Sequence, residues 1–227
     1  MTTNKTYLTL TKTDRAILES YREMVQNLGE YLGDGYEIIL HSLENLHHSV
    51  IQEVNGSYSG RSVGAPITDL ALSMLSRIEQ NSSNSAVCYM NRSKTGVPLR
   101  SATIPVIGEK NRIIGLICIN FYMDLPLSSF LSKFSAPSDP IQQSVSGITE
   151  NFAGSTDELI ETVLNETRIS VWNDASVTSQ NKNKEIVEIL YHKGIFNIKD
   201  SVIKVAQLLN ISKNTVYLHI RNLKNQT

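Results

Sequence analysis

The chain has 227 residues, 41% of them hydrophobic and 19% charged, and a formal net charge of -1. This length favours two domains, and the hydrophobic content is enough for a packed core. The longest apolar run, residues 113–119, is too short to cross a membrane, and residues 1–14 lack the features of a secretory signal. Two cysteines, Cys88 and Cys118, form neither a disulfide framework nor a metal-type Cys-x-x-Cys pair. We therefore expect a cytoplasmic protein with no membrane partner.

The first half of the chain alternates helical and strand-like patterns. Apolar residues recur at helical spacing over 13–33 and again over 67–78. Runs rich in β-branched residues, separated by turn residues, predict strands at 36–42, 48–54, 86–90, 99–107 and 112–122. One helix, two strands, a helical crossing and three antiparallel strands predict an α+β domain with a five-stranded antiparallel sheet over residues 1–125.

Residues 126–182 are expected to connect this domain to the next one, because they contain two loop-like stretches rich in Ser, Pro and Asn. Within them, Ser155 followed by Glu158 forms the sequence of a capping box. The apolar stripe that follows predicts a helix over 157–171. Such a stripe must be buried, either on the helix's own domain or against a second copy of the chain, and the sequence leaves both alternatives open.

The last part of the chain, residues 183–227, reads as a small all-α domain. A first helix is predicted before Gly194, and two short amphipathic helices follow, around residues 205–209 and 213–224. Ser212 is suited to cap the last helix, because its hydroxyl can accept a free backbone N–H. Three short helices around one core, two of them joined by a tight turn, are typical of helix-turn-helix domains that read DNA.

The charge is divided unevenly along the chain. Residues 182–227 contain eight Lys and Arg against three Asp and Glu, whereas the rest of the chain contains 13 basic and 19 acidic residues. A small basic module behind an acidic one favours contact with DNA phosphates. We therefore expect double-stranded DNA as a partner, and the rival interpretation is a helical tail that binds another protein.

The last predicted helix carries the candidate DNA contacts. With its apolar residues in the core, the polar side chains at its start and on its outer face remain for DNA. Asn pairs well with adenine, Arg with guanine and Lys with phosphate. The predicted set is Ser212, Lys213, Asn214, Thr215, Tyr217, Arg221 and Lys224.

A glycine-rich loop at 55–66 is the candidate ligand site of the first domain. Arg61 in this loop either binds an anionic group of an effector or pairs with Glu37 or Glu53 to hold the loop. His41, at the end of a predicted strand, is either a ligand for haem or a metal or a hydrogen-bonded structural residue. No catalytic motif is present, so we expect no enzyme.

Several stretches of the chain resemble a known family. Residues 35–72 resemble the YheO-like PAS domain of bacterial transcriptional regulators: they contain the E-x-x-L-H strand with His41, an I-x-x-x-N-G turn and the S-G-R-x-x-G loop with Ser59 and Arg61. GLICIN (115–120) is similar to the last strand of that domain. Residues 194–220 are similar to the helix-turn-helix of DauR-like regulators, and their V-A-x-x-L-x-I-S-x-x-T-V-x-x-H pattern also matches LuxR-type proteins.

This resemblance implies a sequence-specific DNA-binding regulator, dimeric or of higher order, with a PAS-like domain that senses a small effector or mediates dimerisation. His41, Ser59 and Arg61 are the candidate ligand-binding residues. The alternative is a PAS-type interaction or haem-sensing module with a LuxR-type helix-turn-helix. The sequence identifies neither the effector nor a cofactor.

Overall fold

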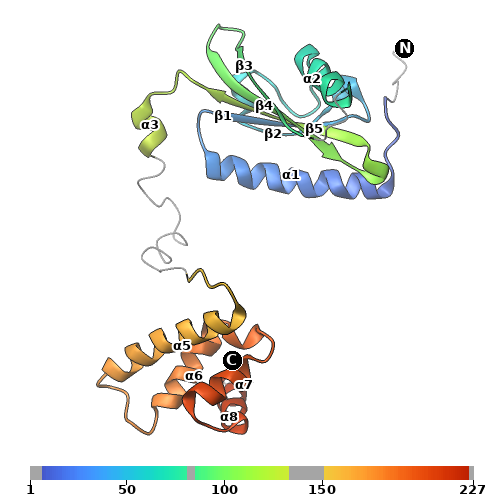
Figure 1. The fold of residues 1–227 in the computed structure, drawn as a ribbon. Helices are drawn as coiled ribbons and strands as arrows, with labels where there is room; N and C mark the ends of the chain where they lie inside the picture. The colour runs from blue at the N-terminus through green and yellow to red at the C-terminus, as the bar shows by residue number, and fades with distance from the viewer. Residues whose placement is uncertain (1–6, 81–84, 133–150, 225–227) are drawn as a thin grey trace. The chain divides into compact units, whose positions relative to one another are not determined.

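The computed structural model describes residues 7–80, 85–132 and 151–224. These residues form two compact units, Met1–Gln143 and Ser144–Thr227, which are described separately below (Figure 1). Among the described helices, none has both the length and the apolar character that crossing a membrane requires.

The N-terminal unit contains the five-stranded sheet that the sequence predicts. Its elements are α1 (Lys12–Leu32), β1 (Tyr36–Ser42), β2 (Val50–Val54), α2 (Asp69–Gln80), β3 (Val87–Arg92), β4 (Pro98–Ile107), β5 (Ile113–Tyr122) and the short α3 (Leu127–Ser132). The strand order is β2-β1-β5-β4-β3, and every neighbouring pair is antiparallel. The predicted α+β class and antiparallel sheet are confirmed.

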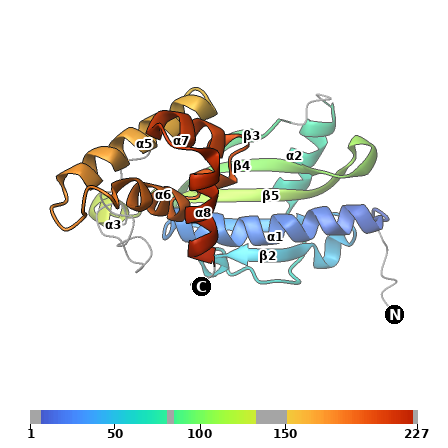
Figure 2. The ribbon, with the colours of Figure 1, turned by 90° about the horizontal axis from the view of Figure 1, so that it is seen from below.

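Helices cover both faces of this sheet (Figures 1 and 2). Successive side chains of a strand point to opposite faces, so β1 contributes to two cores. Ile38 and Leu40 pack with α1 on one face, and Ile39 packs with α2 on the other. Helix α1 ends at Gly33, whose φ of 70° is the left-handed geometry that favours glycine.

Strand β2 and helix α2 each begin two residues later than the sequence pattern predicts. Strand β2 begins at Val50 because Leu46–His48 form a 3-10 turn, in which the Asn45 side chain accepts from the His47 N–H at 3.0 Å. Helix α2 begins at Asp69, where the Thr68 hydroxyl accepts from the Ala71 N–H at 3.1 Å. In both places a short polar side chain satisfies a free backbone N–H, which periodicity alone does not reveal.

Over residues 151–224, the described part of the C-terminal unit, the chain forms four α-helices: α5 (Thr156–Asn173), α6 (Lys182–His192), α7 (Ser201–Leu209) and α8 (Lys213–Lys224). All four helices contribute to one core, which includes Ile160, Leu164, Ile186, Leu190, Val205 and Val216. The predicted all-α helix-turn-helix domain is confirmed, with one helix more than the sequence analysis assigned to it.

That additional helix is α5. The sequence analysis placed residues 157–171 in a connecting region and began the domain at residue 183. In the structure α5 packs against α6 and α7, and Ile160 and Leu164 are buried between them. Lys204 of α7 also forms an ion pair with Glu161, and Arg168 donates to the Leu208 carbonyl at 2.6 Å. The first part of the apolar stripe of α5 is therefore buried on its own domain, whereas Ile169 near its end is 63% exposed.

The start of α5 also differs in detail from the predicted capping box. Ser155 Oγ accepts from the Glu158 N–H at 3.1 Å, as predicted. The Glu158 carboxylate, however, accepts from the Gly154 N–H at 2.8 Å, one residue before the cap. The N–H groups of Glu158 and Gly154 thus each have a side-chain acceptor, which defines the start of the helix.

Candidate functional site

The turn between α7 and α8 fixes the helix that carries the predicted DNA contacts. Asn210 ends α7 in the left-handed conformation, with φ of 56°. Ser212 then caps α8, since its Oγ accepts from the Thr215 N–H at 3.0 Å. The Ser212 and Thr215 hydroxyl oxygens lie 2.8 Å apart. These two members of the predicted DNA-binding set are thus engaged in forming the helix start.

The remaining members of the set lie on the outer face of α8. Val216 is fully buried and Ile220 packs against the core, which directs the opposite face outward. All five outward side chains are exposed: Lys213, Asn214, Tyr217, Arg221 and Lys224. The exposed face therefore offers hydrogen-bond donors and positive charge together.

Acidic side chains gather on the opposite side of this unit. Helix α8 contains no acidic residue, whereas α5 contains four acidic residues and one Arg. Helices α6 and α7 pack against both, and α5 lies on their far side from α8 (Figure 1). Three of the eight basic residues of 182–227 lie on α8, whereas Lys204 pairs with Glu161 of α5. The α8 side of the unit is therefore basic without nearby acids on its own helix.

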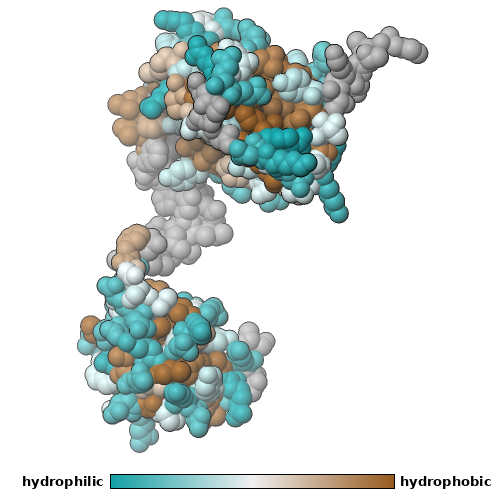
Figure 3. Space-filling model, turned by 45° about the vertical axis from the view of Figure 1, so that its right-hand side comes forward, coloured by the Kyte–Doolittle hydropathy of each residue, from teal (hydrophilic) through white to brown (hydrophobic). Residues whose placement is uncertain are grey.

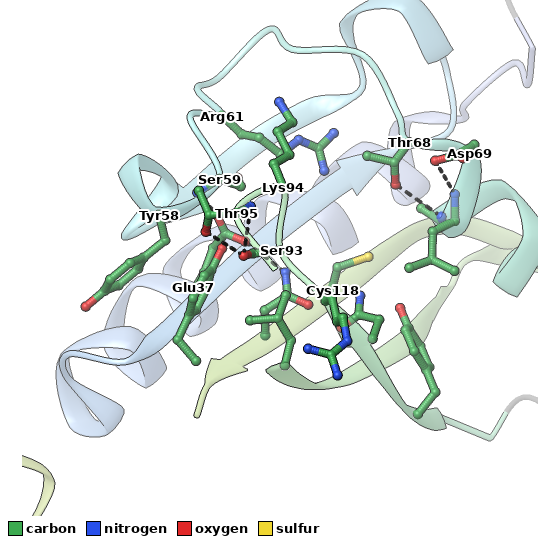
Figure 4. Close-up of a pocket in the computed structure, with 18 residues that line it drawn as sticks. Glu37, Tyr58, Ser59, Arg61, Thr68, Asp69, Ser93, Lys94, Thr95 and Cys118 are labelled. Carbon is green, nitrogen blue, oxygen red and sulfur yellow. Dashed lines mark hydrogen bonds between the residues drawn. The ribbon is translucent and has the colours of Figure 1, made fainter. Parts of the chain in front are cut away.

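The N-terminal unit contains a pocket on the α2 face of the sheet (Figure 4). Its cavity volume is about 290 Å³. The strands β1, β3 and β5, the loop after β2, the start of α2 and the β3–β4 turn all contribute side chains to it. On the visible surface of each unit, hydrophilic side chains are prominent, with hydrophobic patches among them (Figure 3).

A row of polar side chains across four strands underlies this pocket; Glu37, Asn120 and Asn91 line the cavity, and the buried Ser101 connects the two asparagines. Asn120 Nδ2 on β5 donates to Glu37 Oε2 on β1 at 2.8 Å. Ser101 Oγ on β4 lies 2.7 Å from Asn120 Oδ1 and 3.0 Å from Asn91 Oδ1 on β3. Glu37 faces Asn120, and Asn120 faces Ser101, in the strand register. The sheet thereby holds this polar floor rigidly.

Glu37 is the buried charge of the pocket. Its side chain belongs to a residue with 0% exposure, and Oε1 accepts from the Ser59 N–H at 3.1 Å. Among the ion pairs formed by the described residues, none includes Glu37. Its carboxylate is therefore held by neutral donors only.

Arg61 and Ser59, two of the three predicted ligand-binding residues, line the pocket. The Arg61 guanidinium donates to the Pro66 carbonyl, and it forms no ion pair with Glu37 or Glu53. Glu53 instead accepts from the Gly56 N–H at 2.6 Å. The side-chain hydroxyl of Ser59 is buried without a hydrogen-bond partner.

His41, the third predicted ligand-binding residue, does not line the pocket. It is fully buried, and its Nδ1 lies 2.8 Å from Ser49 Oγ. Burial, together with a smaller effect of the positive charge of Arg61, lowers the pKa of His41 to about 3. The imidazole is therefore neutral at physiological pH.

The pocket also contains groups with raised pKa values. Burial raises the pKa of the Cys118 thiol to about 11, so the thiol stays protonated and is a poor nucleophile. Burial, together with the negative charge of the Glu37 carboxylate, raises the pKa of Tyr122 to about 12. Tyr58 stacks on Tyr122 with ring centroids 4.7 Å apart. These groups favour non-covalent binding of a polar molecule.

The sequence analysis missed Asn91, Ser101 and Asn120. One signal was available: each is a polar residue inside a predicted strand, and Asn120 interrupts the apolar run of the last strand. Their alignment into one row depends on the register between strands, which the sequence of a single strand does not specify.

Comparisons with known proteins agree with this two-part organisation. Residues 11–136 match the family described as the YheO-like PAS domain, and residues 155–221 match an HTH domain. The protein YheO of Escherichia coli strain K12 is 44% identical over 213 residues, which cover 94% of this chain and 87% of YheO. A protein of Haemophilus influenzae is 41% identical over 226 residues, covering 100% of this chain and 99% of the relative. The transcriptional regulator DauR of Pseudomonas aeruginosa is 22% identical over 209 residues, covering 91% of this chain and 94% of DauR.

Proposed function

This chain belongs to the family of proteins with a YheO-like PAS domain, and on that premise we propose that it is a sequence-specific DNA-binding transcriptional regulator whose PAS pocket binds a small effector. Its helix-turn-helix domain supports DNA as the partner. The name of its distant relative DauR, a transcriptional regulator, supports the same role. Such a regulator works in the cytoplasm, where bacterial DNA lies.

The observation that carries this proposal is the composition of the exposed face of α8. The helix presents Asn214 and Arg221, which suit direct contact with base edges, and Lys213 and Lys224, which suit contact with phosphates. Because α8 lacks acids and the acids of α5 lie on the far side of the unit, phosphate repulsion at this face is small.

The pocket supports the sensory part of the proposal. It combines a rigid polar floor with Arg61 and an unpartnered buried hydroxyl, so it offers directional contacts to a small polar molecule. An effector changes DNA binding only if it binds one arrangement of the protein more tightly than another. The pocket is therefore the place where such a difference in affinity arises.

The regulator acts as a homodimer or a higher homo-oligomer. One helix-turn-helix domain presents a small interface, and specific regulators place two such domains on half-sites about one helical turn apart. A second copy of the chain would cover apolar side chains that α5 leaves exposed, because Ile169 is 63% and Trp172 is 51% exposed.

The proposal is tested by selecting DNA with the full chain. Random duplexes are passed over the purified protein through repeated rounds, and the enriched pool is sequenced. We expect one enriched motif, with two half-sites about one helical turn apart. The Arg221→Ala and Asn214→Ala variants should lose enrichment at defined positions. A pool that stays random with a folded, monodisperse protein would contradict the DNA-binding role.

A further inference from the structure

Charges of opposite sign line the pocket without neutralising each other. Glu37 lies at the floor, and Arg61 and Lys94 reach the pocket from the loop after β2 and from the β3–β4 turn (Figure 4). We infer that the pocket binds a small dipolar molecule, with a cationic nitrogen at Glu37 and a carboxylate at Arg61 and Lys94. This inference rests on the proposed effector-binding role of the pocket and names the chemical class of the effector.

The surroundings of Glu37 favour a cation. A carboxylate offers about four lone-pair positions, and the described contacts of Glu37 are the Ser59 N–H and Asn120 Nδ2. Both donors are neutral, although a fully buried carboxylate is stabilised most by a charged donor. A ligand ammonium or similar nitrogen can donate to the remaining lone pairs of the carboxylate.

The neighbouring Ser59 hydroxyl gives an independent sign of a ligand. Its Oγ is buried, lines the pocket and has no hydrogen-bond partner within the described part of the chain. Leaving such a group unpaired is unfavourable. Because the Ser59 backbone N–H binds Glu37, this hydroxyl lies beside the carboxylate and can bind the same polar group of a ligand.

The cationic side of the pocket suits a carboxylate. Arg61 uses part of its guanidinium to bind the Pro66 carbonyl, which anchors the side chain, and its other N–H groups remain available. A guanidinium can bind a carboxylate through two parallel hydrogen bonds. Lys94 is exposed at the turn and adds a second positive charge beside the pocket.

Electrostatic effects on Cys118 indicate that the two charges flank one cavity. Burial is the main cause of the raised pKa of this thiol, but Arg61 lowers the pKa and Glu37 raises it. Cys118 itself lines the pocket. The positive charge of Arg61 and the negative charge of Glu37 therefore both act at Cys118 inside the pocket. Two opposite charges on one cavity produce an electric field that orients a dipolar ligand.

The volume sets the size of this ligand. The cavity of about 290 Å³ lies near the lower limit of roughly 300 Å³ for ligand pockets. It therefore suits a small metabolite better than a nucleotide or a large ring system.

The test measures thermal unfolding of the full chain with three matched series of compounds. The first series contains glycine, β-alanine, γ-aminobutyrate and 6-aminohexanoate, which differ in the distance between ammonium and carboxylate. The second contains the corresponding amines without the carboxylate, and the third the corresponding acids without the amine. We expect at least one dipolar compound to raise the unfolding temperature, and its amine and acid counterparts to have little effect at the same concentration.

Variants then assign the two ends of the bound compound. Glu37→Gln preserves the shape of the side chain and removes its charge. The affinity for the dipolar compound, measured by calorimetry, should therefore fall at least about tenfold. Arg61→Gln should weaken the dipolar compound similarly. The matched controls are Glu79→Gln and Arg77→Gln on α2, which are exposed and do not line the pocket.

Three outcomes would overturn the inference. The amines could bind as tightly as the dipolar compounds. The acids could bind as tightly as the dipolar compounds, with an affinity that Glu37→Gln leaves unchanged. Finally, no compound of any series could raise the unfolding temperature. Binding of the same preparation to the selected DNA separates this failure from failure of the proposed function. A protein that binds its DNA site but none of these compounds remains a regulator with an effector of another class.

Discussion

The Asp14 carboxylate and the Arg112 guanidinium lie 2.6 Å apart, although 98 residues separate them in the chain. Asp14 also accepts hydrogen bonds from the backbone N–H groups of Thr11 at 3.0 Å and Glu109 at 2.8 Å. One buried carboxylate thus joins the start of α1 to the β4–β5 hairpin. We infer that this contact fixes α1 on the sheet of the N-terminal unit.

Replacing Asp14 with Asn should therefore lower the stability of the N-terminal unit. The Thr11 N–H above all, and the Glu109 N–H and Arg112 besides, lower the pKa of Asp14 from its usual 3.8, while burial opposes them. The stabilisation is present above pH 3.8 and is lost as the pH falls through the lower, folded-state pKa. Urea unfolding over a pH series measures this, with the exposed Asp124→Asn as control. Equal stability of Asp14→Asn and wild type at neutral pH would contradict the assignment.

His41 should make stability fall in mild acid. Its pKa is about 3 in the folded protein, against 6.5 in the unfolded chain, so only the unfolded state takes up a proton as the pH drops below 6.5. Between about pH 7.5 and about pH 5.5, wild type should lose roughly 1.4 kcal/mol relative to His41→Gln. Parallel stability curves for the two proteins over this range would show that His41 titrates normally.

The outer face of α8 should divide into base-reading and phosphate-binding residues. Asn214→Ala and Arg221→Ala should each cost about 1–3 kcal/mol at the selected site and relax specificity at one position. Lys224→Ala should weaken binding to all DNA sequences alike. It should also reduce the slope of log affinity against log salt concentration by about one unit, as expected for the loss of one phosphate contact. Fluorescence anisotropy at several salt concentrations distinguishes these effects. Asn173→Ala, on the far helix α5, is the control, and a loss as large as that of Asn214→Ala would argue against the proposed orientation.

The assembly should contain at least two copies of the chain. Light scattering at micromolar concentration should give about twice the chain mass of 25.3 kDa, or a higher multiple. If the exposed side of α5 forms the contact, Ile169→Asp should shift the mass toward the monomer, whereas Met24→Asp on α1 should not. A 25.3 kDa species both with and without the selected duplex would refute the dimer.

The sequence was sufficient to predict most helices and strands, because their periodicities are local. Strand β1 was predicted with its observed bounds, 36–42, since it contains Ile38 and Ile39 in a short apolar run that turn residues flank. The outward face of α8 followed from the spacing of Val216, Ile220 and Leu223. Local patterns of this kind also identified Ser212 as a cap.

Long-range pairing could not be predicted in the same way. An apolar stripe shows that α5 must be buried, but it does not show which surface covers it. The pocket floor depends on Glu37 meeting Asn120, 83 residues later, and therefore on the strand order and register of the sheet. The absence of an ion pair between Arg61 and Glu37 or Glu53 likewise depends on the hydrogen bonds that these carboxylates form with the backbone N–H groups of Ser59 and Gly56.

The most direct test of the account is the linkage between pocket and DNA. The affinity of the full chain for the selected duplex is measured with and without a saturating amount of the compound that stabilises the protein most. The compound's own affinity is then measured with and without the duplex. The account predicts that both affinities change by the same factor, on the order of fivefold or more, and that Glu37→Gln abolishes the change. An operator affinity that stays constant while the compound saturates the pocket would contradict the claim that this protein is an effector-controlled regulator.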